Sequence, residues 1–305
     1  MQAESDTVFE DARPRLLSLA YQMLGEVAAA EDIVQEAWLR WHEADRSAVR
    51  APDAWLNSVV TRLAIDQLRS ARQRRETYTG TWLPEPIMDS AAGPADALEL
   101  ARQCELALLW SLERLGAEER AAFLLRQVFD TDYADIARVL ERSEDTCRQL
   151  VSRAGKRVRD GGRAVASAED GTQDSAEDRL EDMLLRFTLA ASAGDKDTVL
   201  ELLAPDVVAV SDGGGVVRAA LIPLEGPERV AQVLTHIASK AQREAPDDMP
   251  EIARVNGRPA FVQMGGTESD MIFTLRLNAA GQICWIYMLR NPHKLELVKS
   301  RLTPQ

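Results

Sequence analysis

Residues 133–157, YADIARVLERSEDTCRQLVSRAGKR, constrain the fold of this chain more than any other stretch. Apolar side chains such as Ile136 and Val139 follow a helical period, and the small Ala137 allows a second helix to cross closely. Ser143 then offers an N-cap, and acidic residues follow it in the first turn of the next helix, where they suit the helix dipole. The pattern predicts two short helices with a capped turn between them, a helix-turn-helix.

The second of these helices is basic along its whole length. Five basic residues and no acidic residue lie between Thr146 and Arg159. Such a charge pattern suits a helix that lies in a phosphate-lined groove of DNA. The alternative is a solvated basic helix at the end of an all-helical domain, but the two-helix pattern with a capped turn favours DNA binding.

Length and composition limit the remaining possibilities. A chain of 305 residues is expected to form two or three domains. No apolar run approaches the length of a membrane span, so we expect no association with a membrane. The first residues are acidic instead of basic and then apolar, so no secretion signal is expected and the cytoplasm is the expected location.

The three cysteines give no sign of a disulfide framework or a metal site. Cys104, Cys147 and Cys284 are far apart and form no CxxC pair. We expect all three to be small buried residues, and we expect neither a metal nor a cofactor.

The formal net charge of −13 argues against a protein that binds duplex DNA tightly by itself. Residues 1–160 also carry more acidic than basic side chains. Phosphate neutralisation supplies most non-specific affinity, so we expect weak DNA binding by the isolated chain. Basic residues are nevertheless clustered, and a second cluster within residues 62–75 has five arginines and the single Asp66.

Composition and periodicity divide the chain into three folded blocks and two linkers. The expected parts are a helical block at 1–76, a linker at 77–97, a second helical block at 98–160, a linker at 161–176 and a third block at 177–305. In the third block, helices are expected at 177–193, 195–203 and 227–241, with strands at 206–211, 216–222, 260–264, 269–277 and 282–289. This order predicts an α+β domain in which a curved antiparallel sheet wraps helices.

The first block contains EDIVQEAWLRW at residues 31–41, which resembles region two of bacterial sigma factors, the promoter-recognition subunits of RNA polymerase. Two small helical domains that end in a helix-turn-helix resemble the extracytoplasmic-function group over residues 8–160. The third block is similar to SnoaL-like domains of the NTF2-like superfold. The resemblance implies a multidomain protein with two all-α sigma domains followed by an α+β SnoaL-like cone domain.

Three short motifs are typical of sigma factors with a fused SnoaL-like domain. They are WLPEP at 82–86, DGGG at 212–215 and NPHKL at 291–295. The chain departs from the group's pattern at Val216, where a basic residue is common, at His293, where an acidic one is usual, and at Glu141, where Gly is common. The residues expected to have interdomain or regulatory roles are Trp82, Leu83, Pro84, Glu85, Pro86, Asp212, Gly213, Gly214, Gly215, Asn291, Pro292, His293, Lys294 and Leu295.

The WLPEP segment contains two prolines and an adjacent Trp and Leu. The prolines make it stiff, and the apolar pair needs a partner, so we expect a buried strap. We expect this strap to pack the third domain against the first helical block. The alternative is a strap that lies on its own helical block.

One face of the 31–41 helix carries residues at spacings of three and four, namely Asp32, Gln35, Glu36 and Leu39. The resemblance implies that this ridge binds the largest subunit of core RNA polymerase. From spacing alone, the alternative is an ordinary solvated face.

The helix at 55–75 carries side chains suited to recognition of the minus-ten promoter element. Arginines are expected on phosphates and smaller polar groups on base edges, with a pocket for an unstacked base formed by the loop at 46–54. Trp55 could stack on a base, although its apolar spacing favours core packing. The expected DNA-binding residues here are Asn57, Thr61, Arg62, Asp66, Arg69 and Arg72.

The basic helix of the helix-turn-helix is the candidate reader of the minus-thirty-five element. Arg and Gln can make bidentate contacts to guanine and adenine edges. The expected DNA-binding residues are Thr146, Arg148, Gln149, Arg153, Lys156 and Arg157.

The third domain also permits an enzyme hypothesis, because relatives of this fold include cyclases and isomerases. Candidate acid or base groups are Asp206, Asp212, His236, Asp270 and His293, but none forms a spacing that demands catalysis. A pocket that binds a small-molecule ligand without turnover is a further alternative. The glycine-rich residues 212–215 lack the Lys and Ser/Thr of a P-loop and are expected to form a turn.

Taken together, the residues and the resemblance predict an alternative sigma factor and not an enzyme. It would bind core RNA polymerase and promoter DNA, and its SnoaL-like domain would modulate its activity. Two rivals remain: a free-standing helix-turn-helix regulator, which the acidic charge of residues 1–160 disfavours, and a SnoaL-type enzyme with accessory DNA-binding domains.

Overall fold

The computed structural model describes residues 2–45, 48–75, 78–89, 104–161, 173–244, 250–264 and 270–302. The chain forms two compact units. Unit 1 comprises residues 1–77 and 92–161, and unit 2 comprises residues 78–91 and 162–305. Part of the predicted linker at 77–97 therefore belongs to unit 2, whereas residues 90–97 of that linker and residues 162–172 of the second lie outside the described part of the chain.

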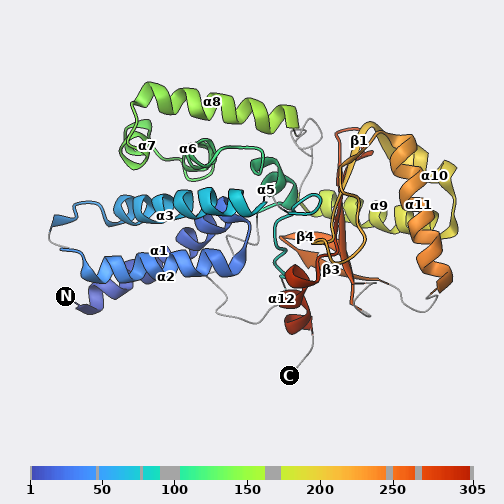
Figure 1. Ribbon diagram of the computed structural model, residues 1–305, viewed down its shortest axis with the longest axis horizontal. Coiled ribbons are helices and arrows are strands. Elements are labelled where there is room, and N and C mark those ends of the chain that lie inside the picture. Colours follow the sequence, from blue (N-terminus) through green and yellow to red (C-terminus); the bar gives the residue numbers. More distant parts are fainter. Residues whose placement is uncertain are drawn as a thin grey trace. The chain divides into compact units, whose positions relative to one another are not determined.

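The described part of unit 1 contains helices joined by turns and loops, and no strand (Figure 1). Its elements are α1 (Gln2–Leu24), α2 (Val27–Glu43), α3 (Pro52–Arg75), α5 (Leu106–Leu112), α6 (Ala117–Gln127), α7 (Tyr133–Leu140) and α8 (Glu144–Gly161). The apolar stripes predicted on the first two helices are buried, as at Leu16, Ile33 and Trp41. Helices α1 and α3 also pack against α6, so both helical blocks share one compact unit.

A buried arginine connects these two blocks. Arg120 of α6 is 1% exposed. Its guanidinium donates hydrogen bonds to the carbonyl oxygens of Met23 (2.6 Å) and Leu112 (3.0 Å), and it pairs with Glu113 (2.5 Å). Met23 and Leu112 lie in the last turns of α1 and α5, where helix carbonyl groups have no partner within the helix. Arg120 therefore satisfies two helix ends that are distant in sequence.

The helix-turn-helix is formed by α7 and α8, and its turn has the predicted cap. The Ser143 hydroxyl accepts a hydrogen bond from the Thr146 amide at 3.2 Å. Glu141, at the end of α7, has φ 56° and ψ 45°, the left-handed conformation that Gly adopts most readily. The turn thus keeps the usual geometry although a glutamate occupies the position.

Unit 2 is an α+β domain built on a six-stranded sheet in the order β2-β1-β6-β5-β4-β3. The strands are β1 (Leu203–Asp212), β2 (Leu224–Glu225), β3 (Glu251–Val255), β4 (Arg258–Gln263), β5 (Met271–Leu277) and β6 (Ile283–Leu289). The helices are α9 (Gln173–Ala193), α10 (Lys196–Leu202), α11 (Pro227–Glu244) and α12 (Pro292–Leu302).

The sheet differs from the sequence prediction in three respects. Strands β1 and β6 pair in parallel, so the sheet is mixed and not wholly antiparallel. Residues 216–222 were expected to form a strand but form a loop before β2, while β3 and α12 were not predicted. A strand prediction uses local alternation, whereas the partner of β1 is a strand about eighty residues away along the chain.

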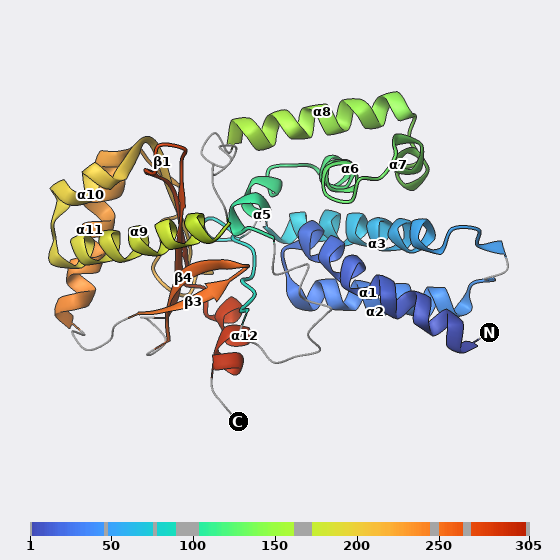
Figure 2. The same ribbon diagram turned by 180° about the vertical axis from the view of Figure 1, so that it is seen from behind.

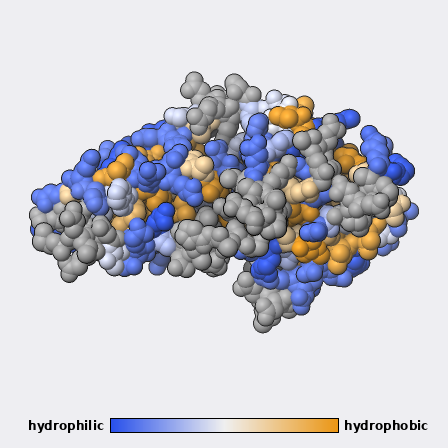
Figure 3. All heavy atoms as spheres, turned by 90° about the horizontal axis from the view of Figure 1, so that it is seen from below, coloured by the Kyte–Doolittle hydropathy of each residue, from blue (hydrophilic) through white to orange (hydrophobic). Residues whose placement is uncertain are grey.

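The core of unit 2 lies between the sheet and helices α9, α10 and α11, which cover one of its faces in Figures 1 and 2. Phe187 of α9 stacks on Phe273 of β5 with ring centroids 5.6 Å apart. Helix α12 lies on the other side of the sheet in both views. Hydrophilic side chains cover much of the face seen in Figure 3, with apolar side chains exposed in patches.

Among the described residues, no helix is both long enough and apolar enough to span a membrane.

Candidate functional site

Residues 78–89 form an ordered segment on unit 2, here called the linker strap. The strap lies in sequence between α3 and α5, and so between the two helical blocks of unit 1. Leu83, Pro84, Pro86, Ile87 and Met88 are buried. The predicted buried strap is therefore present. The alternative, a strap that lies on its own helical block, is wrong, because the strap residues belong to unit 2.

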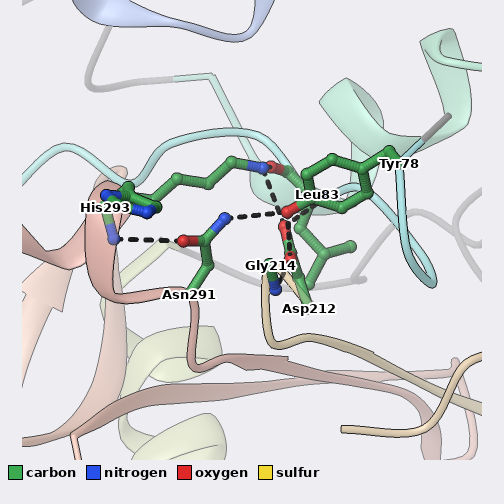
Figure 4. A network of polar contacts seen from close by, with 7 residues as sticks. Tyr78, Leu83, Asp212, Gly214, Asn291 and His293 are labelled. Atoms are coloured by element: carbon green, nitrogen blue, oxygen red, sulfur yellow. Dashed lines mark hydrogen bonds and ion pairs between the residues drawn. The ribbon is translucent and has the colours of Figure 1, made fainter. Parts of the chain in front are cut away.

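Asp212, at the end of β1, is the acceptor that holds the first half of the strap (Figure 4). One carboxylate oxygen accepts hydrogen bonds from the Tyr78 hydroxyl at 2.5 Å and the Gly214 amide at 2.9 Å. The other accepts from the Leu83 amide at 3.0 Å. These donors come from both the strap and the DGGG turn, so one buried carboxylate fastens the strap to the sheet.

Lys294 of α12 supplies the positive charge beside this carboxylate. Its ammonium group lies 2.7 Å from the second Asp212 oxygen and also donates to the carbonyl oxygen of Leu83. The two charged side chains are 7% and 0% exposed. The ammonium also lies 4.1 Å from the Trp82 ring centroid, a cation–π distance. A buried ion pair with this many further partners is strongly sensitive to the loss of either charge.

Asn291 completes the network at the start of α12. Its amide nitrogen donates to the Tyr78 hydroxyl at 2.7 Å, and its side-chain oxygen accepts from the His293 amide at 3.0 Å. The side chain of His293 itself is exposed. Asn291 therefore caps the helix that carries Lys294 and also contacts the strap.

We call the set Tyr78, Leu83, Asp212, Asn291 and Lys294 the strap clamp. It joins all three motifs singled out in the sequence, and it shows why the DGGG turn requires glycine. A Cβ atom on Gly213 would lie 2.0 Å from the carbonyl oxygen of Val217, and one on Gly214 would lie 2.6 Å from the Asn291 side chain. The predicted turn is present at 212–215.

Gly213→Ala is expected to destabilise unit 2 strongly, because its new methyl group meets backbone and not a flexible side chain. Gly281→Ala is the matched control: Gly281 has φ 76° but nothing within 4 Å of an added Cβ, so only backbone strain of about 1–2 kcal/mol is expected. The stability of unit 2 in both variants is measured by hydrogen–deuterium exchange in increasing denaturant. A smaller loss for Gly213→Ala than for Gly281→Ala would contradict the described packing.

The far end of the strap is fixed by a second set of contacts. The Ile87 amide donates to the Asn256 side-chain oxygen at 3.0 Å, and the Asn256 amide donates to the Ile87 carbonyl at 2.8 Å. Arg254 pairs with Asp89 at 3.4 Å and with Glu177 at 2.6 Å. The hydrogen bonds that Arg254 donates to Glu177, with a smaller effect of Asp89, raise the pKa of Arg254 above its usual value.

The other residues of the three motifs lie outside the strap clamp. Trp82 and Glu85 are half-buried, Leu295 is buried, and Pro292 begins α12. Val216, where the group often has a basic residue, is 63% exposed.

Tyr78 was not predicted. Its signal was weak, because a tyrosine outside the WLPEP motif has no local feature that points to a partner 134 residues away.

The predicted polymerase-binding ridge lies on one face of α2. Asp32, Gln35 and Leu39 are exposed, and Glu36 is half-buried and pairs with Arg40 at 2.8 Å. The opposite face of the helix, including Ile33 and Ala37, is buried. The ridge is therefore accessible on unit 1 as the spacing predicted.

The residues predicted for base contacts on α3 are not all accessible. Asn57 and Thr61 are 8% and 0% exposed, so the structure places them in the core, and in this arrangement they cannot reach a base. Sequence spacing could not show this, since polar side chains one helical turn apart usually mark a solvated face. Trp55 packs against Trp41 with centroids 5.4 Å apart, which agrees with core packing.

The charged residues of α3 reach the surface, but two of them contact the second helical block. Arg62 donates to the carbonyl oxygens of Arg138 (3.0 Å) and Val139 (3.1 Å), and Arg69 pairs with Glu118 at 2.8 Å. Asp66 is exposed. The side chain of Arg72, and residues 46–47 of the predicted base pocket, lie outside the described part of the structure.

The basic helix α8 presents an exposed face. Gln149, Arg153 and Lys156 are exposed and lie one turn apart, so they share that face. Arg148 is exposed but pairs with Glu144 (2.8 Å) and Asp145 (3.0 Å) of its own helix. Thr146 is half-buried near the cap, and Arg157 pairs with Glu119. The structure thus brings three of the six predicted groups onto one surface.

All three cysteines are buried, as expected. Burial raises the pKa of Cys104 to about 11, and it also raises that of Cys147. Their thiols are therefore protonated near neutral pH and poorly reactive. In the described ranges, no group of three or more His, Cys, Asp or Glu is arranged to hold a metal ion.

The chain matches two family models, Sigma-70 region 2 over residues 8–75 and Sigma-70, region 4 over residues 106–158. It is 39% identical over 296 residues to the ECF RNA polymerase sigma factor SigJ of Mycobacterium tuberculosis, covering 94% of this chain and 91% of the relative. It is 33% identical to the probable ECF sigma factor SigI of the same organism, covering 95% of this chain and 94% of the relative.

The crystal structure of Mycobacterium tuberculosis SigJ matches with a TM-score of 0.73 and 34% identity, covering 95% of this chain and 98% of that chain. The two helical blocks followed by an α+β sheet domain thus define a sigma-70 class protein with a fused C-terminal domain, and the predicted fold class is confirmed. The chain belongs to the extracytoplasmic-function family of RNA polymerase sigma factors. Its function is that of the family, promoter-specific initiation of transcription.

Proposed function

We propose that the SnoaL-like domain modulates this sigma factor through the strap clamp. The single observation that carries the proposal is the buried Asp212–Lys294 pair, which fastens to unit 2 the very segment that connects the two promoter-reading blocks of unit 1. A domain that holds this connection influences how far the blocks can separate.

Chain length gives the physical basis. Residues 76–105 connect α3 to α5. With the strap fixed, only residues 76–77 and 90–105 of this connection can change their span, about 60 Å if extended, whereas all thirty connecting residues could span about 100 Å if extended. Release of the strap therefore lengthens the connection that is free to adapt to polymerase and DNA. We expect clamp release to raise promoter-specific transcription.

We further propose that the SnoaL-like domain acts as a regulatory domain and not as an enzyme. Both oxygens of Asp212 accept hydrogen bonds from groups that hold the strap, which suits a structural role. Asp206, His236 and His293 are exposed, and Asp270 is buried. A small-molecule ligand of this domain stays a proposal, and binding screens on the full chain would test it.

For the helical blocks, we propose that the α2 ridge binds core polymerase and that the exposed face of α8, with Arg153, reads the minus-thirty-five element. Asp32→Arg with Glu36→Arg should abolish capture of core polymerase, because the charge of the ridge is reversed. Asp178→Arg with Asp182→Arg on α9 is the matched control: both residues are exposed, and Asp182 pairs with Arg186 as Glu36 pairs with Arg40.

Arg153→Ala supplies the complementary variant in the same assay. It should retain polymerase capture and lower promoter-specific transcription, by about tenfold if a bidentate base contact is lost. Unchanged capture by the α2 variant would remove that ridge from the interface. Loss of capture by Arg153→Ala would show that the substitution disturbs folding and not DNA readout.

A further inference from the structure

The contact between α3 and the end of α7 joins elements assigned to two different DNA sites. Arg62 of α3 donates to two carbonyl oxygens in the last turn of α7, where the helix dipole places partial negative charge. The same guanidinium lies 3.2 Å from the carboxylate of Glu141. Arg62 is therefore surrounded by the negative end of a helix and a full negative charge.

The spacing of promoter elements is incompatible with this contact. Elements centred near positions −10 and −35 lie about 25 base pairs apart, or about 85 Å at 3.4 Å per base pair. Helix α3 has 24 residues and is therefore about 36 Å long. While α3 touches α7, the two reading elements cannot reach both sites, so the contact must open on the promoter. This step rests on the proposed function.

We propose that Glu141 and the end of α7 form an internal competitor for DNA phosphate at Arg62. In the free chain, Arg62 binds the α7 end and keeps unit 1 closed. On promoter DNA, a phosphate takes the place of the carboxylate and the carbonyl oxygens, and the second helical block is released to reach its own element. Glu141 is thus a regulatory residue in the turn of the helix-turn-helix.

The backbone at Glu141 supports this assignment. Its left-handed conformation is one that glycine adopts without a steric penalty, and glutamate does not. The side chains of Arg62 and Glu141 are 50% and 76% exposed, and an ion pair so exposed to solvent contributes little to stability. A glutamate at this position is therefore not explained by local stability. It is explained by the placement of its carboxylate beside the α3 arginine.

Two neighbouring pairs follow the same pattern. Arg69 of α3 pairs with Glu118 of α6, which also contacts Arg142, and Arg157 of α8 pairs with Glu119. Arginines predicted to bind DNA are thus paired with carboxylates of the same unit. The Arg62–Glu141 and Arg69–Glu118 pairs join the two helical blocks and are partly exposed, so salt weakens them and opening of unit 1 should increase with ionic strength.

The test uses the full-length chain with three variants. Glu141→Gln removes the charge and keeps the side-chain size, and Glu141→Gly also relieves the backbone strain. Asp130→Gly is the matched control, because Asp130 also has a positive φ (45°) and an exposed carboxylate, but it pairs with Arg126 of α6 and not with α3. Spin labels on Ser70→Cys of α3 and Ser152→Cys of α8 report the separation, since the native cysteines are buried.

In the free protein, both Glu141 variants should raise the population at longer label distances about two- to fivefold, and Asp130→Gly should not. Glu141→Gln should also raise core-dependent transcription in the same proportion. An unchanged distance distribution for Glu141→Gln would overturn the proposal. Longer distances without a gain in transcription would overturn the competition with DNA. If the unmodified chain gave no core-dependent transcription, the proposed function would fail, while the distance measurement would still decide whether Glu141 holds unit 1 closed.

Discussion

Arg120→Met is expected to destabilise unit 1 by about 3–5 kcal/mol, the loss typical when one partner of a buried ion pair is removed. The guanidinium of Arg120 serves the carbonyl oxygens of Met23 and Leu112 and the carboxylate of Glu113. A methionine fills a similar volume but donates no hydrogen bond, so these groups lose their buried donor.

The measurement is hydrogen–deuterium exchange of the full-length chain in increasing denaturant, with peptides from each unit followed separately. Exchange in α1, α5 and α6 should accelerate, and peptides of unit 2 should not change, because Arg120 belongs to unit 1. Arg138→Ala is the control: its side chain is 73% exposed, and a change within about 0.5 kcal/mol is expected. Equal effects of the two substitutions would refute a central role for Arg120.

Lys294→Met should release the first half of the strap from unit 2. The substitution removes the ammonium group that lies 2.7 Å from Asp212, and the carboxylate stays buried beside an apolar side chain. We expect a loss of about 3–5 kcal/mol in the docking of the first half of the strap, seen as faster exchange of the Leu83 amide, whereas the Ile87 amide keeps its bond to Asn256. Lys240→Met is the control, because Lys240 is 57% exposed and pairs only loosely with Glu244 (3.6 Å).

A double substitution separates the ion pair from general packing. Asp212→Asn with Lys294→Met removes both charges, so no buried carboxylate is left without a cation. The double variant should be less destabilised than the sum of the two single variants by more than about 0.5 kcal/mol, the limit for independent sites. Additive losses would mean that the two side chains do not act as a pair.

Local sequence patterns predicted the helices of unit 1 well, because the period of apolar residues in a helix is set within a few turns. The helix-turn-helix follows from Ile136, Val139 and Ser143, and the structure has both helices and the cap. The ridge on α2 is exposed for the same reason. Patterns of this kind depend on neighbours in sequence and not on distant partners.

Features that depend on distant partners were not predicted. Nothing local marks Arg120 as buried, because arginine is usually found at the surface and its partners at Met23 and Leu112 come from other helices. Asn57 and Thr61 are buried because of how α3 packs, and their residue types do not predict burial. The parallel pairing of β1 with β6 likewise joins distant strands.

The strap clamp lies between these two cases. The motifs that contain Asp212, Asn291 and Lys294 were singled out in the sequence, and a buried strap was expected from the two prolines and the Trp-Leu pair. The ion pair between Asp212 and Lys294 and the role of Tyr78 became visible only when the fold brought these segments together. Packing of the third domain against the first helical block stays a prediction.

Regulation through the strap clamp is tested most directly by transcription in vitro with purified core RNA polymerase, from a promoter identified by mapping transcription starts in cells that overproduce the protein. Full-length chain, Lys294→Met and Lys240→Met are compared at equal occupancy of core enzyme. We expect more promoter-specific transcript with Lys294→Met than with the unmodified chain, and no change with Lys240→Met. Equal transcript from all three, with strap release demonstrated by hydrogen exchange, would contradict regulation through the strap clamp.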